Sequence, residues 1–286
     1  MLRPGKLLLI PTLLLALSVG ASAGKPLRIN GSTTVNPVVA EAAELLRAER
    51  GLTIHVDTQG GSSGGIAALV EGRAEVAMIS RELDEEDRRR HPGARFQVVE
   101  IGLDAVALVV SRDVWESGVR NLSKEQVRGI YEGRIKSWKP LGGADRRLAF
   151  FNKEPGRGTW EVFAKWLYGS PKAAPLVSHL EVGANEEARN KVAGTPGSLS
   201  QLSAAWADGT KVFALGIRLD GGRVALPNAE AIRNGSYPIA RRLSVVTDGL
   251  PAGDARALID LLLSPRGQAL VAKHGYLPIA AQGAGR

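Results

Sequence analysis

The chain has 286 residues, a formal net charge of +8 and no cysteine. Without cysteine it forms neither disulfides nor cysteine-ligated metal sites, so its stability has to come from an apolar core, for which this length is ample. Aromatic residues make up only 5% of the sequence, which argues against a surface that stacks nucleic-acid bases. The basic surplus favours anionic ligands by long-range attraction, although a generally basic surface explains it equally well.

The first 23 residues are predicted to be a signal peptide. A basic segment at 1–6 precedes an apolar run at 7–19, and Ala21-Ser22-Ala23 has the small residues of a cleavage site. An uncleaved anchor is the alternative, but the run is short and is interrupted by Pro11. We therefore expect cleavage near Ala23, secretion across the inner membrane and a periplasmic mature protein.

Strand-like and helix-like patterns alternate along the rest of the chain. Residues 52–56 alternate apolar and polar side chains, as in a strand, whereas residues 37–46 repeat apolar side chains at helical spacing. Such strand–loop–helix repeats predict an α/β sheet with ligands at the carboxyl ends of its strands. The expected elements, in chain order, are a strand at 27–29, a helix from Pro37, a strand at 52–56, a helix through 66–70, strands at 75–79 and 105–110, a helix capped by Ser123 with Gln126, and a closing helix at 255–263.

Three glycine- and hydroxyl-rich segments occur where a strand is expected to lead into a helix. They are Gly31-Ser32-Thr33-Thr34, Gly60-Gly61-Ser62-Ser63-Gly64-Gly65 and Gly156-Arg157-Gly158-Thr159. A helix start presents unpaired backbone N–H groups and a partial positive charge, and glycine lets a ligand approach closely. One such segment is an ordinary helix cap, but three that meet at one point would surround a small tetrahedral oxyanion with donors.

The order of the motifs resembles that of the periplasmic phosphate-binding proteins of ABC importers, in their shorter form. The resemblance covers nearly the whole mature chain, and it depends on the order of eight motifs, each of which is weak alone. The matching segments are Gly31 to Pro37, Gly61 to Ile66, Ser80 to Leu83, Leu122 to Gln126, Ile130 to Gly133 with Trp138, Gly156 to Thr159, Tyr237 to Arg241, and Ser264 to Gln268 with Gly275 to Pro278.

The resemblance implies an α/β fold of the type II periplasmic-binding-protein class, with two lobes joined by two crossing strands that act as a hinge. The first lobe would comprise residues 24–104 plus 243–286, and the second residues 105–242. The crossings are expected near 103–105 and near 241–243. The anion would be buried between the lobes, and a membrane permease would recognise the closed form.

The resemblance also implies a set of ligand-binding residues that donate hydroxyl, backbone N–H or positively charged groups to the anion. Charge-assisted hydrogen bonds of this kind make a buried anion favourable. No catalytic residue, metal site or cofactor is expected, since the four histidines are scattered and no nucleophile motif occurs. The ligand-binding set is Ser32, Thr33, Thr34, Ser62, Ser63, Arg81, Lys153, Arg157, Gly158 and Thr159.

The third segment departs from the family pattern Arg-x-x-Gly-Ser-Gly-Thr. Lys153 stands in place of the arginine and Arg157 in place of the serine. Either Arg157 reaches into the cleft and supplies the guanidinium that Lys153 lacks, or it points to solvent and the site has one donor fewer. The sequence leaves both alternatives open.

Arg81 is a second departure, because longer family members place an aspartate there. Such a carboxylate accepts a hydrogen bond from a protonated phosphate and thereby rejects fully ionised sulfate, whereas arginine accepts nothing. Shorter members resemble this chain in having Ser-Arg, so phosphate remains the expected ligand. Arg81 either binds the anion or pairs with Glu82, Asp84 or Asp104, and selectivity over sulfate or arsenate stays open.

The sequence therefore predicts an exported, monomeric solute-binding protein that captures inorganic phosphate, or a similar tetrahedral oxyanion, for an ABC permease in the inner membrane. It is expected neither to be an enzyme nor to bind nucleic acid. The alternative is an oxyanion sensor, or an adhesion or matrix protein, that keeps the fold without transport. The altered third segment motivates this alternative, and a phosphatase is a third, weaker hypothesis.

Overall fold

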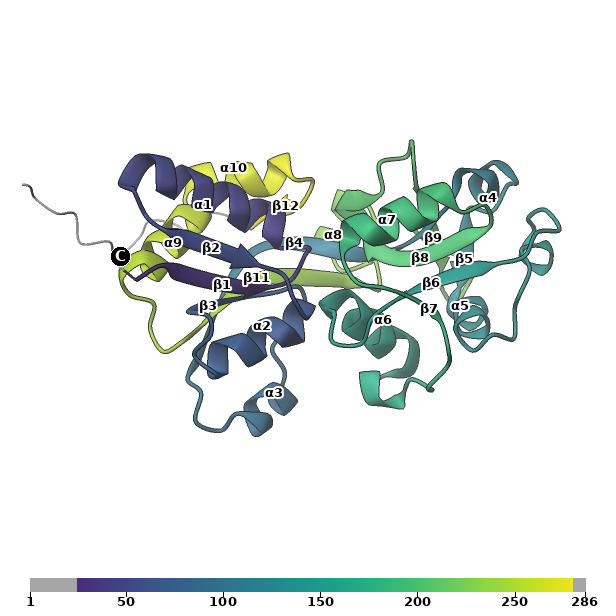
Figure 1. Ribbon diagram of the computed structural model, residues 1–286. Helices are drawn as coiled ribbons and strands as arrows, with labels where there is room; N and C mark the ends of the chain where they lie inside the picture. The colour runs from purple at the N-terminus through teal and green to yellow at the C-terminus, as the bar shows by residue number, and fades with distance from the viewer. Residues whose placement is uncertain (1–24, 280–286) are drawn as a thin grey trace, which may run out of the picture.

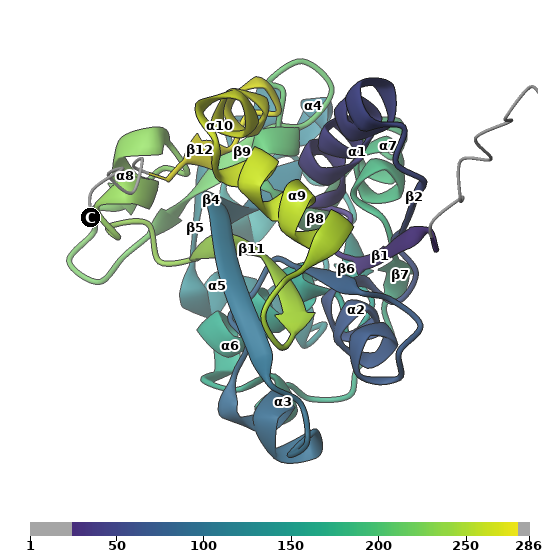
Figure 2. The same ribbon diagram turned by 90° about the vertical axis from the view of Figure 1, so that its left-hand side faces the viewer.

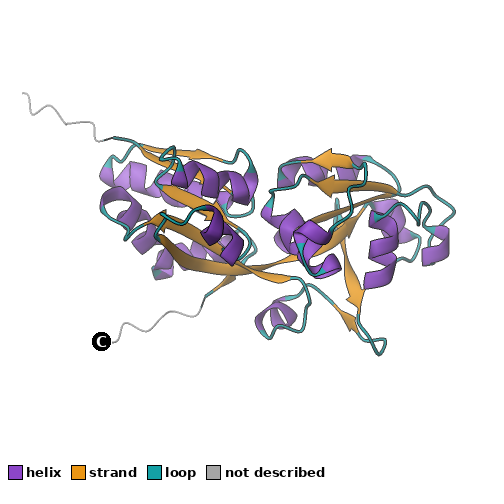
Figure 3. Ribbon diagram, turned by 90° about the horizontal axis from the view of Figure 1, so that it is seen from below, coloured by secondary structure: helices purple, strands orange, loops and turns teal. Residues whose placement is uncertain are grey.

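The protein consists of two lobes that lie side by side (Figure 1). The computed structural model describes residues 25–279, so the predicted signal peptide lies outside the described residues. Seen from below, strands run from one lobe into the other (Figure 3). The predicted α/β fold with two lobes and crossing strands is confirmed, whereas the residue limits of the lobes stay a prediction. No helix in the described range is long and apolar enough to cross a membrane.

The first lobe is a sheet in the order β2-β1-β3-β11-β4 with helices on both faces. Its elements are β1 (Leu27–Gly31), α1 (Asn36–Arg50), β2 (Ile54–Asp57), α2 (Gly61–Val70), β3 (Val76–Ile79), α3 (Glu85–Arg90), β4 (Phe96–Val110), β11 (Ala240–Asp248), α9 (Gly253–Leu263), α10 (Pro265–Lys273) and β12 (Leu277–Pro278). In Figure 1, α1, α9 and α10 cover one face of the sheet, and α2 lies on the other face. Strands β1, β2 and β3 are parallel, so their carboxyl ends meet at one edge, which faces the second lobe.

The second lobe is built on β8, β6 and β7, which continue the sheet from the far half of β4. Its other strands pair through β9, which contacts β4, β5 and β10. Its elements are α4 (Arg112–Glu116), β5 (Asn121–Ser123), α5 (Lys124–Tyr131), β6 (Ala149–Lys153), α6 (Gly158–Tyr168), β7 (Leu180–Val182), α7 (Asn185–Gly194), β8 (Ser198–Ser203), β9 (Phe213–Arg218), β10 (Val224–Ala225) and α8 (Ala229–Arg233), with short 3-10 helices at Lys139–Leu141, Pro171–Ala173 and Ala204–Trp206. The capping box predicted for α5 is confirmed: Ser123 Oγ accepts from Gln126 N at 3.2 Å, and Gln126 Oε1 accepts from Ser123 N at 2.9 Å.

Two antiparallel strands connect the lobes. The 15 residues of β4 pair with β11 over their first part and with β8 from Val106 onward. Figure 2 shows β4 and β11 running beside each other. Their register places Arg241 opposite Asp104 at the junction of the lobes. This pairing brings a guanidinium and a carboxylate, 137 positions apart in sequence, to one point.

Helix α2 begins earlier than its sequence suggests. The segment at 60–65 reads as a loop, but the helix starts at Gly61, and Gly60 adopts a left-handed conformation before it. Glycine is required because α2 lies against the end of β1: a Cβ at Gly65 would be 2.7 Å from the carbonyl oxygen of Asn30. The hydroxyls of this segment therefore belong to the first turn of a helix that packs directly on the sheet.

A second helix, α10, follows the closing helix α9 and was not predicted from the sequence. Ser264 and Pro265 end α9, as predicted, and they also start α10. Ser264 Oγ accepts a hydrogen bond from Gly267 N at 3.2 Å, and proline is favourable in the first turn of a helix. One Ser-Pro pair thus ends one helix and caps the next.

Gly31→Ala should destabilise the protein far more than Gly51→Ala. Both glycines have positive φ, +140° at Gly31 and +66° at Gly51, but only Gly31 lies against a neighbour, where a Cβ would be 2.1 Å from Met78 O. We expect Gly51→Ala to lower the free energy of unfolding by about 1 kcal/mol and Gly31→Ala by about 3 kcal/mol or more. Denaturant unfolding of both variants tests this, and equal losses would contradict the close approach of β1 to β3.

Candidate functional site

A small cavity lies between the lobes, where the amino ends of four helices meet. Its volume is about 190 Å³, including its mouth. The loop before α1 and the first turns of α2, α6 and α7 all contribute to its wall, and each presents N–H groups that have no acceptor within its own helix. The lining residues are Ser32, Thr33, Thr34, Gly61, Ser62, Ser80, Lys153, Arg157, Gly158, Thr159, Gly183 and Asn185.

Most of the predicted ligand-binding residues line this cavity. Of the ten, the exceptions are Ser63 and Arg81. The cavity is also lined by four residues that were not predicted as ligands, namely Gly61, Ser80, Gly183 and Asn185. A signal for Asn185 was present, because Gly183-Ala184-Asn185 lies between a strand and a helix, as the three recognised segments do.

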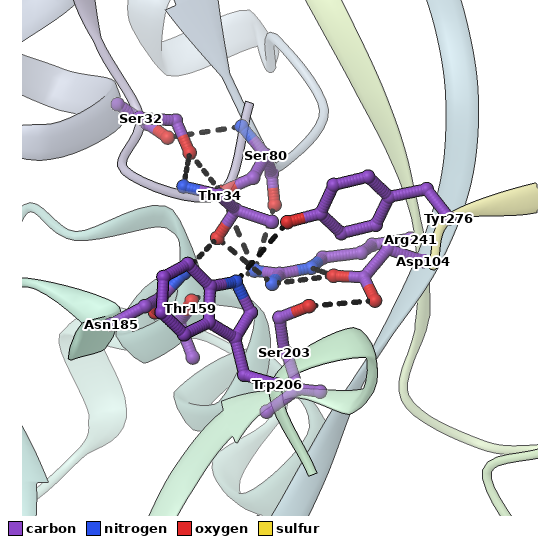
Figure 4. Close-up of polar contacts among 12 residues, drawn as sticks. Ser32, Thr34, Ser80, Asp104, Thr159, Asn185, Ser203, Trp206, Arg241 and Tyr276 are labelled. Atoms are coloured by element: carbon purple, nitrogen blue, oxygen red, sulfur yellow. Dashed lines mark hydrogen bonds and ion pairs between the residues drawn. The ribbon is translucent and has the colours of Figure 1, made fainter. Parts of the chain in front are cut away.

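Two threonine hydroxyls accept hydrogen bonds from protein donors and keep their own hydrogens available. Thr34 Oγ1 accepts from Asn185 Nδ2 at 2.9 Å and from Arg241 Nη2 at 3.3 Å. Thr159 Oγ1 accepts from Arg241 Nη1 at 2.9 Å (Figure 4). A hydroxyl has two acceptor lone pairs and one hydrogen, and arginine only donates. Each threonine therefore keeps its hydrogen for a ligand.

Three serines extend this donor arrangement. Ser80 Oγ accepts from Ser32 Oγ at 2.9 Å and from Arg241 Nη1 at 3.4 Å, while Ser62 Oγ accepts from Ser80 N at 3.1 Å. The hydrogens of Ser62 and Ser80 remain available. Ser32 has a different role, since its hydroxyl donates to Ser80 and accepts from Thr34 N, and so fixes the loop before α1. The backbone N–H of Thr34, expected as a ligand donor, is used by this internal bond.

Arg241 lies beneath the cavity and was not predicted as a site residue. Its side chain is 1% exposed, and Asp104 Oδ2 accepts from Nε at 3.0 Å and from Nη2 at 2.8 Å. Ser203 Oγ donates to the other oxygen of Asp104 at 2.9 Å (Figure 4). The remaining donors of Arg241 point to Thr34, Ser80 and Thr159. The guanidinium thus orients the hydroxyls without lining the cavity itself.

Lys153 is the most deeply buried positive group in the wall, with 1% of the residue exposed. Its Nζ donates to the carbonyl oxygens of Gly183 at 2.9 Å and of Ala184 at 2.7 Å, so of its three N–H groups one remains free. Burial, and then the charges of Arg157 and Arg241, lower the pKa of Lys153 to about 7. An anion in the cavity would supply the negative charge that this ammonium lacks.

Arg157 lines the cavity, but its guanidinium is already engaged. Nε and Nη2 donate to Glu154 at 3.0 and 2.9 Å, and Nη1 donates to Thr58 O at 3.3 Å. The side chain is 17% exposed, so it neither points to open solvent nor reaches freely into the cleft. The position of the Arg157 side chain is thus intermediate between the two alternatives that the sequence left open, a ligand in the cleft and a side chain in solvent.

Ser63 and Arg81 do not line the cavity and instead contact acidic side chains. Arg81 donates to Asp87 from Nη1 at 2.5 Å and from Nη2 at 3.0 Å, and it forms an ion pair with Glu161. Ser63 Oγ donates to Glu161 Oε1 at 2.6 Å. Asp87 lies in α3 and is buried, so this helix contributes a carboxylate to the cluster. Both predicted ligands are held outside the cavity by these partners.

Hydrogen bonds across the cleft hold the lobes closed. Ser63 N donates to Gly156 O at 3.1 Å, and Asn185 Nδ2 reaches Thr34 from the opposite lobe at 2.9 Å. The contacts of Arg157 with Thr58 and of Glu161 with Ser63 also bridge the lobes. A ligand in this cavity would be held between the two lobes. Within residues 25–279, no group of three or more His, Asp or Glu side chains is placed to hold a metal ion.

Comparison with known proteins identifies a family and several relatives. The family model described as the PBP superfamily domain matches residues 18–266. The chain is 29% identical over 255 residues to the phosphate-binding protein PstS of Bacillus subtilis, covering 88% of this chain and 80% of that protein. It is 27% identical over 264 residues to the phosphate-binding protein PstS of Borreliella burgdorferi, covering 89% and 90%.

Solved structures resemble the whole fold. A putative phosphate ABC transporter substrate-binding protein with bound phosphate, from Clostridium perfringens, superposes with a TM-score of 0.78 at 28% identity and covers 90% of this chain and all of that one. An ABC-type phosphate transport receptor from Vibrio cholerae gives a TM-score of 0.69 at 26% identity, covering 88% of this chain and all of that one.

The lowered pKa of Lys153 predicts how the stability of the ligand-free protein changes with pH. The folded protein releases this proton near pH 7 and the unfolded chain only near the ordinary pKa, so between these values the unfolded state binds more protons. The free energy of unfolding should therefore rise with pH above 7, by up to about 1.4 kcal/mol per pH unit relative to Lys153→Met. Denaturant unfolding at pH 7, 8 and 9 measures the free energy of unfolding of the unmodified protein and of Lys153→Met. If this free energy changes with pH equally in both proteins, the lowered pKa of Lys153 is contradicted.

Proposed function

Because the chain belongs to the PBP superfamily, we propose that it is a solute-binding protein that captures inorganic phosphate, or a closely related tetrahedral oxyanion, for an ABC importer. The relatives named as phosphate-binding proteins match along most of their length, and they support this ligand. Binding is the whole of the proposed activity, with no covalent step.

The observation that carries the proposal is the direction of the hydrogen bonds in the cavity. Thr34, Ser62, Ser80 and Thr159 each accept a hydrogen bond from a protein donor, so their hydrogens are available to a ligand. Of the described residues that line the cavity, none carries a carboxylate. Donors around a buried space with a positive group in its wall favour an anion, because each hydrogen bond to it is charge-assisted.

Lys153 is the proposed charged ligand. It is buried and has one N–H to spare, and burial followed by the charges of Arg157 and Arg241 lowers its pKa. Arg157 closes the cavity wall and shares its charge with Glu154. The proposed ligand set is therefore Thr33, Thr34, Ser62, Ser80, Lys153, Gly158 and Thr159, with Arg157 at the wall and with Arg81 and Ser63 stabilising the closed lobes.

The proposed function also includes export of the protein and delivery of the anion to a permease. The signal peptide would be cleaved near Ala23, and the mature monomer would act in the periplasm. The lobes, residues 24–104 plus 243–286 and 105–242, would open about the crossing strands and close on the anion. An inner-membrane ABC permease would then take the ligand from the closed form.

Calorimetric titration of the phosphate-stripped mature protein tests the proposed function. We expect micromolar or tighter binding of inorganic phosphate, and absence of binding would overturn the proposal. Ser62→Ala removes a hydroxyl donor that is completely buried, so it should weaken binding by about tenfold or more. Ser178→Ala is a matched control, because Ser178 is exposed and does not line the cavity, and its affinity should equal that of the unmodified protein.

Two further variants distinguish the contributions of the cationic residues. Lys153→Met should weaken phosphate binding more than Arg157→Ala, because the donors of Arg157 are already held by Glu154 and Thr58. We expect a loss for Arg157→Ala below about tenfold, which is less than the loss of a hydrogen bond to a charged group. Titration of both variants with phosphate measures the order, and a larger loss for Arg157→Ala would make Arg157 the principal charged ligand instead.

A further inference from the structure

A larger cavity, here called the second-lobe cavity, lies apart from the cavity between the lobes. Its volume is about 1170 Å³ including its mouth, and the two cavities share no lining residue. Its wall is formed mainly by the end of α5, the start of β6 and the residues before β7, all in the second lobe (Figure 1). Strand β6 runs between the two cavities, since Phe150 lines the second-lobe cavity and Lys153 lines the other.

Apolar and aromatic side chains make up most of the wall of the second-lobe cavity. A cavity of this kind, with a few polar groups at defined places, is typical of a site for a small molecule. No aspartate or glutamate is among the described residues that line it. Its apolar lining includes Ile130, Tyr131, Ile135, Leu148, Phe150 and Val177.

The wall also contains a histidine packed against two aromatic rings. The ring centroid of His179 lies 4.6 Å from that of Tyr131 and 5.3 Å from that of Phe150. Burial lowers the pKa of His179, so the ring is neutral at pH 7 and adds to the apolar wall. Its Nε2 is buried and has no hydrogen-bond partner among the described residues, which is uncommon in an ordinary core.

Two cationic side chains lie at the mouth of the second-lobe cavity. Lys136 and Arg147 both line it and are exposed, and neither forms an ion pair with a described residue. The nearby Arg134, in contrast, is paired with Glu132. An apolar wall with unpaired positive charge at its mouth is complementary to a ligand that has an apolar body and an anionic end.

We infer that the second-lobe cavity binds an amphipathic carboxylate of the fatty-acid type. The hydrocarbon chain lies against the apolar wall, and the carboxylate stays at the mouth beside Lys136 and Arg147. Removal of the chain from water supplies most of the affinity, because exposed ion pairs contribute little. The two cations orient the ligand and favour a carboxylate over an alcohol. This site goes beyond the proposed function, and neither depends on the other.

Calorimetric titration of the mature protein with decanoate, below the concentration at which it forms micelles, tests the inference. Acetate lacks the chain and decanol lacks the charge, so they are the matched probes. We expect decanoate to bind and acetate not to bind. Lys136→Gln combined with Arg147→Gln should weaken decanoate binding by about fivefold or more, because each exposed ion pair contributes about two- to fivefold. The same change should alter decanol binding by less than about twofold.

Two neighbouring variants locate the bound chain. Val177→Asp places a carboxylate in the apolar wall, so decanoate binding should fall by at least about tenfold. Leu176→Asp is the matched control, because Leu176 is fully exposed and does not line the cavity, and its effect should stay below about twofold. Thermal unfolding without ligand establishes that each variant is folded. If Val177→Asp does not fold, the variants at the exposed Lys136 and Arg147 carry the test.

The outcomes are distinct from those for phosphate. Absence of decanoate binding would overturn the inference, as would equal losses for Val177→Asp and Leu176→Asp. It would also be overturned if the glutamine variants weakened decanoate and decanol by the same factor, since the cations would then not hold the carboxylate. Loss of decanoate binding in Val177→Asp and in the glutamine variants, with decanol binding retained in the latter, supports it. Failure of the unmodified protein to bind phosphate overturns the proposed function alone.

Discussion

The buried ion pair between Asp104 and Arg241 is the interaction on which the rest of the site depends. The two side chains are 2% and 1% exposed, and they face each other across the two strands that join the lobes. Removing one partner of such a pair would leave an uncompensated buried charge, at a cost of about 3–5 kcal/mol. Because Asp104 neutralises Arg241, the guanidinium can lie beneath a cavity. It then acts by orienting the hydroxyl groups to which it donates, and not by its net charge.

Arg241 connects the hinge to the ligand cavity. Its donors reach Thr34 and Ser80 from the first lobe and Thr159 from the second, so they can be satisfied together only when the lobes are closed as they are here. The same hydrogen bonds orient the hydroxyls as donors. Lobe closure and the proposed anion recognition therefore use one set of atoms.

Local patterns in the sequence predicted the starts of α1 and α5 but not the partners of the long side chains. The loop before α1 and the capping box of α5 depend on neighbouring residues, and both were predicted correctly. Arg81 and Ser63 also lie in recognised motifs, yet their side chains turn to Asp87 and Glu161, the latter on the other lobe. The motif determines where the backbone goes, whereas competition among distant partners determines where a long side chain points.

The sequence by itself determined the alternation of strands and helices and the glycine- and hydroxyl-rich helix starts, and its resemblance to a family implied two lobes with an anion between them. Only the tertiary structure decided that Arg241 lies under the cavity and that α7 adds a fourth helix start. Helix caps and strand periodicity come from neighbours in sequence, so a reader of the sequence can find them. The register of β4 with β11 and the closure of the lobes join residues more than a hundred positions apart, and no local pattern encodes them.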